Sequence, residues 1–61
     1  MNCMLVNVIN TTLETCDYTL CADACRDYLW AVAYNCPVVF HNQTYQELWR
    51  TLISICYGEG H

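Results

Sequence analysis

Six cysteines in 61 residues are the feature of this sequence with the clearest chemical meaning. The stretch CDYTLCADAC, residues 16–25, holds three of them, separated by gaps of four and three residues. Thiols at this density bind a metal ion, carry out redox reactions or form structural disulfides. The full set is Cys3, Cys16, Cys21, Cys25, Cys36 and Cys56.

The spacing argues against a metal centre and against redox catalysis. A zinc site needs a second pair of ligands to complete its tetrahedron. Residues 16–25 can supply one pair, but Cys36 and Cys56 stand alone. We place His41 in a loop and His61 at the chain end. The C-x-x-C motif of redox sites is absent, and we therefore expect no metal and no cofactor.

The length of the chain favours disulfides. A chain of about 60 residues buries only about 60% of its unfolded surface and usually needs a covalent or metal cross-link. An even number of cysteines in so short a chain indicates disulfides formed in an oxidising compartment. We expect one domain over residues 1–61 in a secreted, extracellular protein. The start MNCMLVNVI lacks the basic residues of a signal peptide, and a native Met1 would instead favour the mitochondrial intermembrane space.

The charge of the chain restricts its partners. The sequence has no lysine, two arginines and a formal net charge of −4. Nucleic acids and anionic lipid headgroups are bound through clustered positive charge. No apolar run approaches the roughly 20 residues that span a bilayer. We expect no nucleic-acid binding and no membrane insertion, which leaves a protein receptor or a second copy of the chain as the partner.

Residues 44–57 predict a helix. Thr44 and Glu47 match a capping box, and Gly58 is a natural C-terminal stop. The apolar residues between them recur at helical spacing. These residues are Tyr45, Leu48, Trp49, Leu52 and Cys56.

The segment TLCADACRDYLWAVAYNC, residues 19–36, predicts a second helix, which Pro37 ends. A backward extension of this helix would turn Asp17 and Glu14 into its apolar face, so we expect a break near residues 16–18. The expected inward stripe is Leu20, Cys21, Ala24, Cys25, Tyr28, Leu29, Val32 and Cys36.

The first segment allows two interpretations. Leu5, Ile9, Leu13 and Cys16 fit one helical face, whereas its β-branched residues lower helix propensity. A capping box of Thr11 with Glu14 would instead start the helix late and leave residues 3–9 extended. We expect an all-α fold, a small disulfide-rich three-helix bundle that runs up, down and up.

The bundle geometry restricts the disulfides. Cys21 and Cys36 on one continuous helix would lie about 22 Å apart, far beyond the roughly 7 Å limit for bridged Cα atoms. Cys3 and Cys36 fall at one end of an up-down-up bundle. We favour a Cys3–Cys36 disulfide, Cys56 with Cys21 or Cys25, and Cys16 with the one that remains.

Catalysis has little support in the sequence. The carboxylates of Asp23 and Asp27, four residues apart on a helix, resemble an acid and base pair, but we interpret them instead as a solvated face beside Arg26. Ser54 is the lone serine and has no triad partners. The core is also too small for a deep pocket. We expect no enzymatic activity.

The outer face of the middle helix is a candidate partner-binding face. Asp23, Asp27, Trp30 and Tyr34 recur at i, i+4, i+7 and i+11 and therefore share one stripe. Tryptophan and tyrosine beside charged residues are typical of interface anchors, although Trp30 could equally pack beneath a neighbouring segment. Two candidate glycosylation sites match the acceptor motif, at Asn10 and Asn42.

Two stretches resemble a known family. CDYTLCADAC resembles the segment with the second to fourth cysteines of the waterborne mating pheromones of ciliates, and YNCPVVF looks like the Cys-Pro-aromatic ends of those proteins. They are short, acidic, lysine-poor three-helix bundles with six cysteines. The resemblance implies a secreted signal that binds a cell-surface receptor and self-associates through helix faces. It also implies the disulfides Cys3–Cys25, Cys16–Cys56 and Cys21–Cys36.

Two functional classes follow from these features. In the first, the protein is a secreted, pheromone-like signalling ligand that binds a cell-surface receptor through the middle-helix stripe. In the second, it is a disulfide-stapled accessory or structural subunit of a larger protein assembly, for which the high apolar content of 56% and the intact Met1 are the indications.

Overall fold

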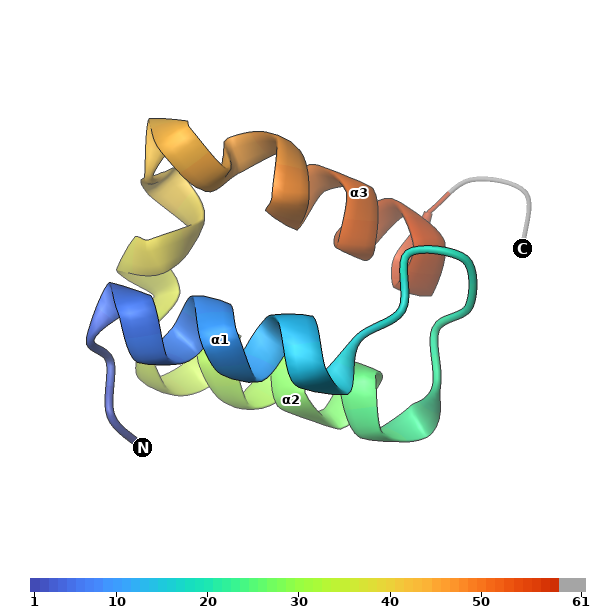
Figure 1. Cartoon of the computed structure of the whole chain (residues 1–61), viewed down its shortest axis with the longest axis horizontal. Helices are drawn as coiled ribbons and strands as arrows, with labels where there is room; N and C mark the ends of the chain where they lie inside the picture. Colours follow the sequence, from blue (N-terminus) through green and yellow to red (C-terminus); the bar gives the residue numbers. More distant parts are fainter. Residues whose placement is uncertain (59–61) are drawn as a thin grey trace.

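Three α-helices run up, down and up along the long axis of the molecule (Figure 1). The computed structural model describes residues 1–58, so His61 lies outside the described residues. No strand occurs within this range, and the small disulfide-rich helical bundle is confirmed. The elements are α1 (Leu5–Thr15), α2 (Asp23–Asn35), the short 3-10 turns η1 (Pro37–His41) and η2 (Gln43–Tyr45), and α3 (Gln46–Tyr57).

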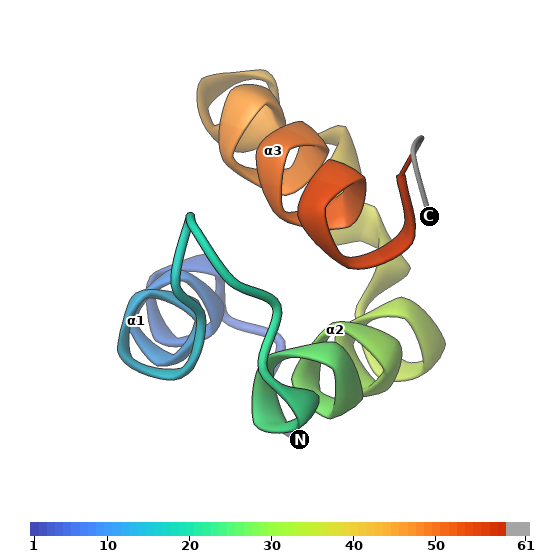
Figure 2. The ribbon, with the colours of Figure 1, turned by 90° about the vertical axis from the view of Figure 1, so that its right-hand side faces the viewer.

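The helices enclose a small core. α1 and α2 lie antiparallel and side by side, and α3 crosses above them, so that the end-on view in Figure 2 is triangular. Side chains from all three helices and from η1 meet between them. The buried apolar residues are Val8, Ile9, Cys25, Leu29, Val32, Cys36, Val39, Trp49, Leu52 and Cys56.

α1 starts early rather than late. It begins at Leu5, so the start at Thr11 with a Thr11–Glu14 capping box is wrong. Val8 and Ile9 are buried against the rest of the core. Most helical stability in proteins comes from such packing, which here outweighs the lower helix propensity of β-branched residues.

The buried face of α1 is rotated from the predicted one. Ile9 is buried and Leu5 partly buried, but Leu13 is half exposed and Val8 and Thr12 occupy the core instead. The Thr12 hydroxyl donates a hydrogen bond to the Val8 carbonyl at 2.7 Å. That bond satisfies the hydrogen-bonding capacity of the buried hydroxyl. Thr12 is therefore buried in the core, where the apolar pattern predicted its neighbour Leu13.

The segment before α2 is a turn rather than helix. The Asp17 carboxylate accepts hydrogen bonds from the Thr19 N–H at 2.9 Å and the Thr19 hydroxyl at 2.8 Å, and both donors lower the pKa of Asp17. A bridge from Asp17 to Leu20 closes the turn. The predicted break is confirmed, but the inward positions of Leu20 and Ala24 are wrong, since both side chains are exposed and α2 begins only at Asp23.

The rest of α2 follows the prediction. Cys25, Leu29, Val32 and Cys36 are buried. The helix ends one residue before Cys36, and Pro37 follows as the first residue of η1. Proline disfavours helical geometry in the residue before it, and Cys36 has φ −138° and ψ 49°.

α3 begins two residues after the predicted start. The Asn42 side chain accepts a hydrogen bond from the Thr44 N–H at 3.0 Å, so Asn42 caps this segment and the Thr44–Glu47 capping box is wrong. Gly58 ends the helix as predicted, and its N–H donates to the Ser54 carbonyl at 2.8 Å. A Cβ atom on Gly58 would collide with that carbonyl oxygen. The predicted inward residues Trp49, Leu52 and Cys56 are buried, and Tyr45 and Leu48 are partly buried against the core.

Three disulfides close the bundle. Cys3–Cys36 joins one end, with 5.5 Å between Cα atoms, as predicted. At the other end Cys56 pairs with Cys21, and Cys16 pairs with Cys25. This pairing decides between the alternatives that the sequence left open.

The pairing implied by the pheromone resemblance is wrong for this structure. It would join Cys21 to Cys36, which lie before the start and just after the end of one continuous helix. It would also join Cys3 to Cys25, although Cys3 is bonded at the C-terminal end of α2 and Cys25 lies in the first turn.

Removal of a disulfide should destabilise the fold according to the length of the loop that it closes. The sequence separation is 33 for Cys3–Cys36 and 9 for Cys16–Cys25, which corresponds to about 3.7 and about 2.6 kcal/mol of loop entropy. We expect Cys3→Ala/Cys36→Ala to lower the free energy of unfolding by about 1 kcal/mol more than Cys16→Ala/Cys25→Ala does.

Urea unfolding followed by circular dichroism measures both double variants. Each pair has one buried member, Cys36 or Cys25, so the losses of packing are comparable. A larger loss for Cys16→Ala/Cys25→Ala would contradict the loop-length explanation.

Candidate partner-binding face

The four residues predicted to bind a partner all lie exposed on α2. Trp30 is 50% exposed and Tyr34 78% exposed, and Asp23 and Asp27 are exposed as well. The rings of Trp30 and Tyr34 stack, with 5.5 Å between their centroids. The alternative in which Trp30 packs beneath a neighbouring segment is therefore wrong.

The aromatic cluster continues onto α3. The ring of Tyr57 meets Trp30 edge to face, at a centroid distance of 6.1 Å. Its hydroxyl donates a hydrogen bond to the Arg26 carbonyl at 3.4 Å. We call Trp30, Tyr34 and Tyr57 the aromatic cluster, which joins the middle of α2 to the last residue of α3.

An open apolar groove lies beside the aromatic cluster. It has a volume of about 320 Å³ and separates the outer surfaces of α2 and α3. The buried side chain of Leu29 and the ring of Phe40, from η1, both line the groove. The Phe40 ring also packs edge to face against the buried Trp49, with 5.1 Å between the ring centroids. The residues that line the groove are Leu29, Trp30, Ala33, Phe40, Ile53 and Tyr57.

Sequence reasoning missed the α3 side of this face. Ile53 and Tyr57 are 41% and 45% exposed. They lie four residues apart, so they share one side of the helix next to the buried stripe. That periodicity was visible, but only the fold shows that this side faces the Trp30 side of α2.

Negative charge borders the face. Asp23 and Asp27 have no ion-pair partner among residues 1–58, where the one ion pair joins Arg50 to Glu47 at 3.6 Å on α3. Partial burial raises the pKa of Tyr57, an effect that Arg26 opposes and Asp27 reinforces. Tyr57 therefore remains a neutral hydrogen-bond donor at neutral pH.

The glycosylation candidates differ in their surroundings. Asn10 is exposed on α1, whereas Asn42 is half-buried and its side-chain oxygen caps the turn before α3. The Asn10 motif ends at Thr12, which is buried. Glycosylation at either site stays a prediction.

The structure brings no catalytic constellation to the face. All six cysteines are in disulfides. His41 is exposed at the end of η1 and does not line the groove, although its neighbour Phe40 does. The absence of enzymatic activity and of a cofactor stays a prediction.

Comparison with protein-family models, with curated proteins and with solved structures finds no match to this chain. No helix in the described part of the chain is long and apolar enough to cross a membrane. Three disulfides are compatible with an extracellular protein.

The two tryptophans should report separately on the face and on the core. Trp30 is half exposed and Trp49 is 2% exposed. We expect Trp30→Phe to leave a blue-shifted emission that acrylamide quenches several-fold less efficiently than the emission of the parent protein. The substitution lies on the surface, so the free energy of unfolding should change by no more than about 0.5 kcal/mol.

Steady-state quenching of the parent protein and of Trp30→Phe and Trp49→Phe makes this comparison. Equal quenching constants for Trp30→Phe and Trp49→Phe would show that the two rings are equally accessible, against the exposure described above.

Proposed function

We propose that this protein is a secreted signalling protein that binds a cell-surface receptor protein through the aromatic cluster and its groove. The observation that carries the proposal is the exposure of Trp30, Tyr34 and Tyr57 around one apolar groove. Tryptophan and tyrosine are the residues most enriched at the centres of protein interfaces.

The rigidity of the scaffold supports this proposal. Binding loses affinity when loops and side chains must be ordered, and preorganisation removes part of that loss. α2 and α3 are each tied to the bundle by disulfides, and the rings of the cluster already contact one another. A partner therefore meets a surface that is largely in its bound arrangement.

Charge indicates the chemistry of the partner. Asp23 and Asp27 lie on the same stripe as the cluster without ion-pair partners among the described residues. Complementary charge steers association and suppresses wrong partners. We infer a receptor surface with an apolar side chain for the groove and basic residues at its edge, and the net charge of −4 opposes self-association through the same face.

The pheromone resemblance supports the same class of function. It rests on CDYTLCADAC and YNCPVVF, on six cysteines and on an acidic, lysine-free composition. The three disulfides fit the oxidising environment outside the cell. The different pairing of the cysteines weakens the assignment to that family but leaves the argument from the exposed face unchanged.

Removal of two rings tests the proposal. We expect Trp30→Ala/Tyr34→Ala to reduce binding of fluorescently labelled protein to intact cells of the producing organism by roughly 30-fold or more, since a hot-spot residue contributes about 2 kcal/mol or more. Both side chains are exposed, so thermal stability should change little.

A matched control removes two exposed apolar residues from α1. Val6→Ala/Leu13→Ala truncates side chains that are 56% and 51% exposed, and we expect it to bind as the parent protein does. Equal binding by the two double variants would overturn the proposed face. A large loss of stability in Trp30→Ala/Tyr34→Ala would instead assign these rings to the fold.

A further inference from the structure

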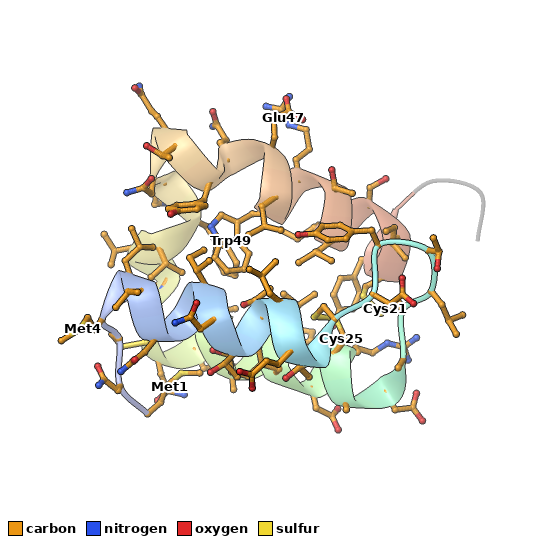
Figure 3. All side chains as sticks on the ribbon, viewed as in Figure 1. Met1, Met4, Cys21, Cys25, Glu47 and Trp49 are labelled. Carbon is orange, nitrogen blue, oxygen red and sulfur yellow. A yellow bond between two sulfur atoms is a disulfide. The ribbon has the colours of Figure 1, made fainter. Side chains whose placement is uncertain are left out.

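Four sulfur atoms meet at one end of the bundle. Cys16 follows α1, Cys25 lies in the first turn of α2 and Cys56 in the last turn of α3, while Cys21 comes from the connecting loop. The Sγ atoms of Cys21, Cys25 and Cys56 all lie within 4.8 Å of one another. The Sγ of Cys16 is bonded to that of Cys25. We call these four residues the sulfur cluster, of which Figure 3 labels Cys21 and Cys25.

This arrangement removes the sequence argument against a metal. That argument failed to find a fourth ligand because Cys56 stands alone in the sequence. The fold places Cys56 beside Cys21 and Cys25. Zinc bound tetrahedrally by four thiolates at about 2.3 Å holds its sulfurs about 3.8 Å apart. The sulfurs of Cys21, Cys25 and Cys56 already lie within 4.8 Å of one another, and the fourth, that of Cys16, is attached directly to Cys25.

We propose that the sulfur cluster of the reduced protein binds one Zn²⁺ ion through four thiolates. Two molecules of an external dithiol reduce Cys16–Cys25 and Cys21–Cys56. Each dithiol gives two electrons and two protons to one of these disulfides and is itself oxidised to a disulfide. The four thiols that form release their protons when the metal binds. The same end of the bundle would then be closed by two disulfides in an oxidising compartment and by zinc in a reducing one.

The surroundings of the sulfur cluster suit thiolates. Cys25 is the third residue of α2, and the positive end of a helix dipole stabilises a thiolate there. Cys25 is fully buried and Cys56 almost so, whereas Cys21 is partly exposed. An open depression of about 480 Å³ that includes Thr19, Cys21, Arg26 and Cys56 in its lining gives a reductant or a metal ion access.

The remaining disulfide provides an internal control. Cys3–Cys36 lies at the other end of a molecule that is 31 Å long. Its sulfurs are not part of the cluster. Cys3→Ser/Cys36→Ser therefore keeps all four proposed ligands, whereas Cys25→Ser/Cys56→Ser removes two of them and the same number of thiols.

The test is a cobalt titration of the reduced full-length chain. A phosphine reductant in the absence of oxygen opens the disulfides without competing for the metal, and Co²⁺ reports tetrahedral thiolate ligation through its visible absorption bands. We expect the bands to saturate at one equivalent, to disappear when Zn²⁺ is added, and to be accompanied by a gain of helical circular dichroism, since metal binding and folding are coupled.

The variants decide whether the four ligands are the proposed ones. Cys3→Ser/Cys36→Ser should titrate as the parent chain does. Cys25→Ser/Cys56→Ser should bind the metal more than about 100-fold more weakly, beyond the 10–100-fold loss that follows when only the hydrogen-bond partners of the ligands are changed. Absence of the bands, saturation above one equivalent, or equal loss in the two variants would overturn the proposal. None of these outcomes bears on receptor binding by the aromatic cluster, which is measured on the oxidised protein.

Discussion

The fold depends on cross-links because its core is too small to hold three helices by itself. Ten apolar residues in the described range 1–58 are buried, and their burial must compensate the conformational entropy lost on folding. α3 meets the pair formed by α1 and α2 from above. Cys21–Cys56 attaches its C-terminal end, while the η1 and η2 turns lead from α2 into its other end. Without that disulfide the last turn of α3 would have few ties to the loop before α2.

The cross-links also explain the apolar surface. The sequence is 56% hydrophobic, yet many large apolar side chains remain exposed, among them Leu20, Trp30, Tyr34 and Val38. Here the backbone is fixed covalently, so side chains on the outer faces of α2 and α3 are free to serve another purpose. Apolar surface grouped around a groove is typical of an interaction site.

The sequence predicted the elements better than their ends. Apolar periodicity identified three helices, and Pro37 and Gly58 marked two ends correctly. Two starts were wrong because a short polar side chain competed: Asn42 capped the turn where Thr44 was expected, and Asp17 formed a turn that removed Leu20 from α2. Such competition depends on local backbone geometry that a motif does not contain.

Contacts between elements were predictable only in part. The ends of an up-down-up bundle were sufficient to pair Cys3 with Cys36. They did not decide between Cys21 and Cys25 for Cys56, because those two residues are four positions apart in the sequence and both lie at the same end of the bundle. The same limit applies to the aromatic cluster. Trp30 and Tyr34 could be predicted because they share one stripe of α2. The contribution of Tyr57 could not, because it depends on how α3 is oriented relative to α2.

The two proposed sites are linked through adjacent residues. Cys56 belongs to the sulfur cluster and Tyr57, the next residue, to the aromatic cluster. The Tyr57 hydroxyl binds the carbonyl of Arg26, which follows Cys25 directly. The bonds that hold the end of α3 against α2 therefore also set the distance between Tyr57 and Trp30, and with it the width of the groove. A rigid link at the sulfur cluster is thus a condition for a preformed aromatic face, and four thiolates on one metal ion would provide that link as two disulfides do.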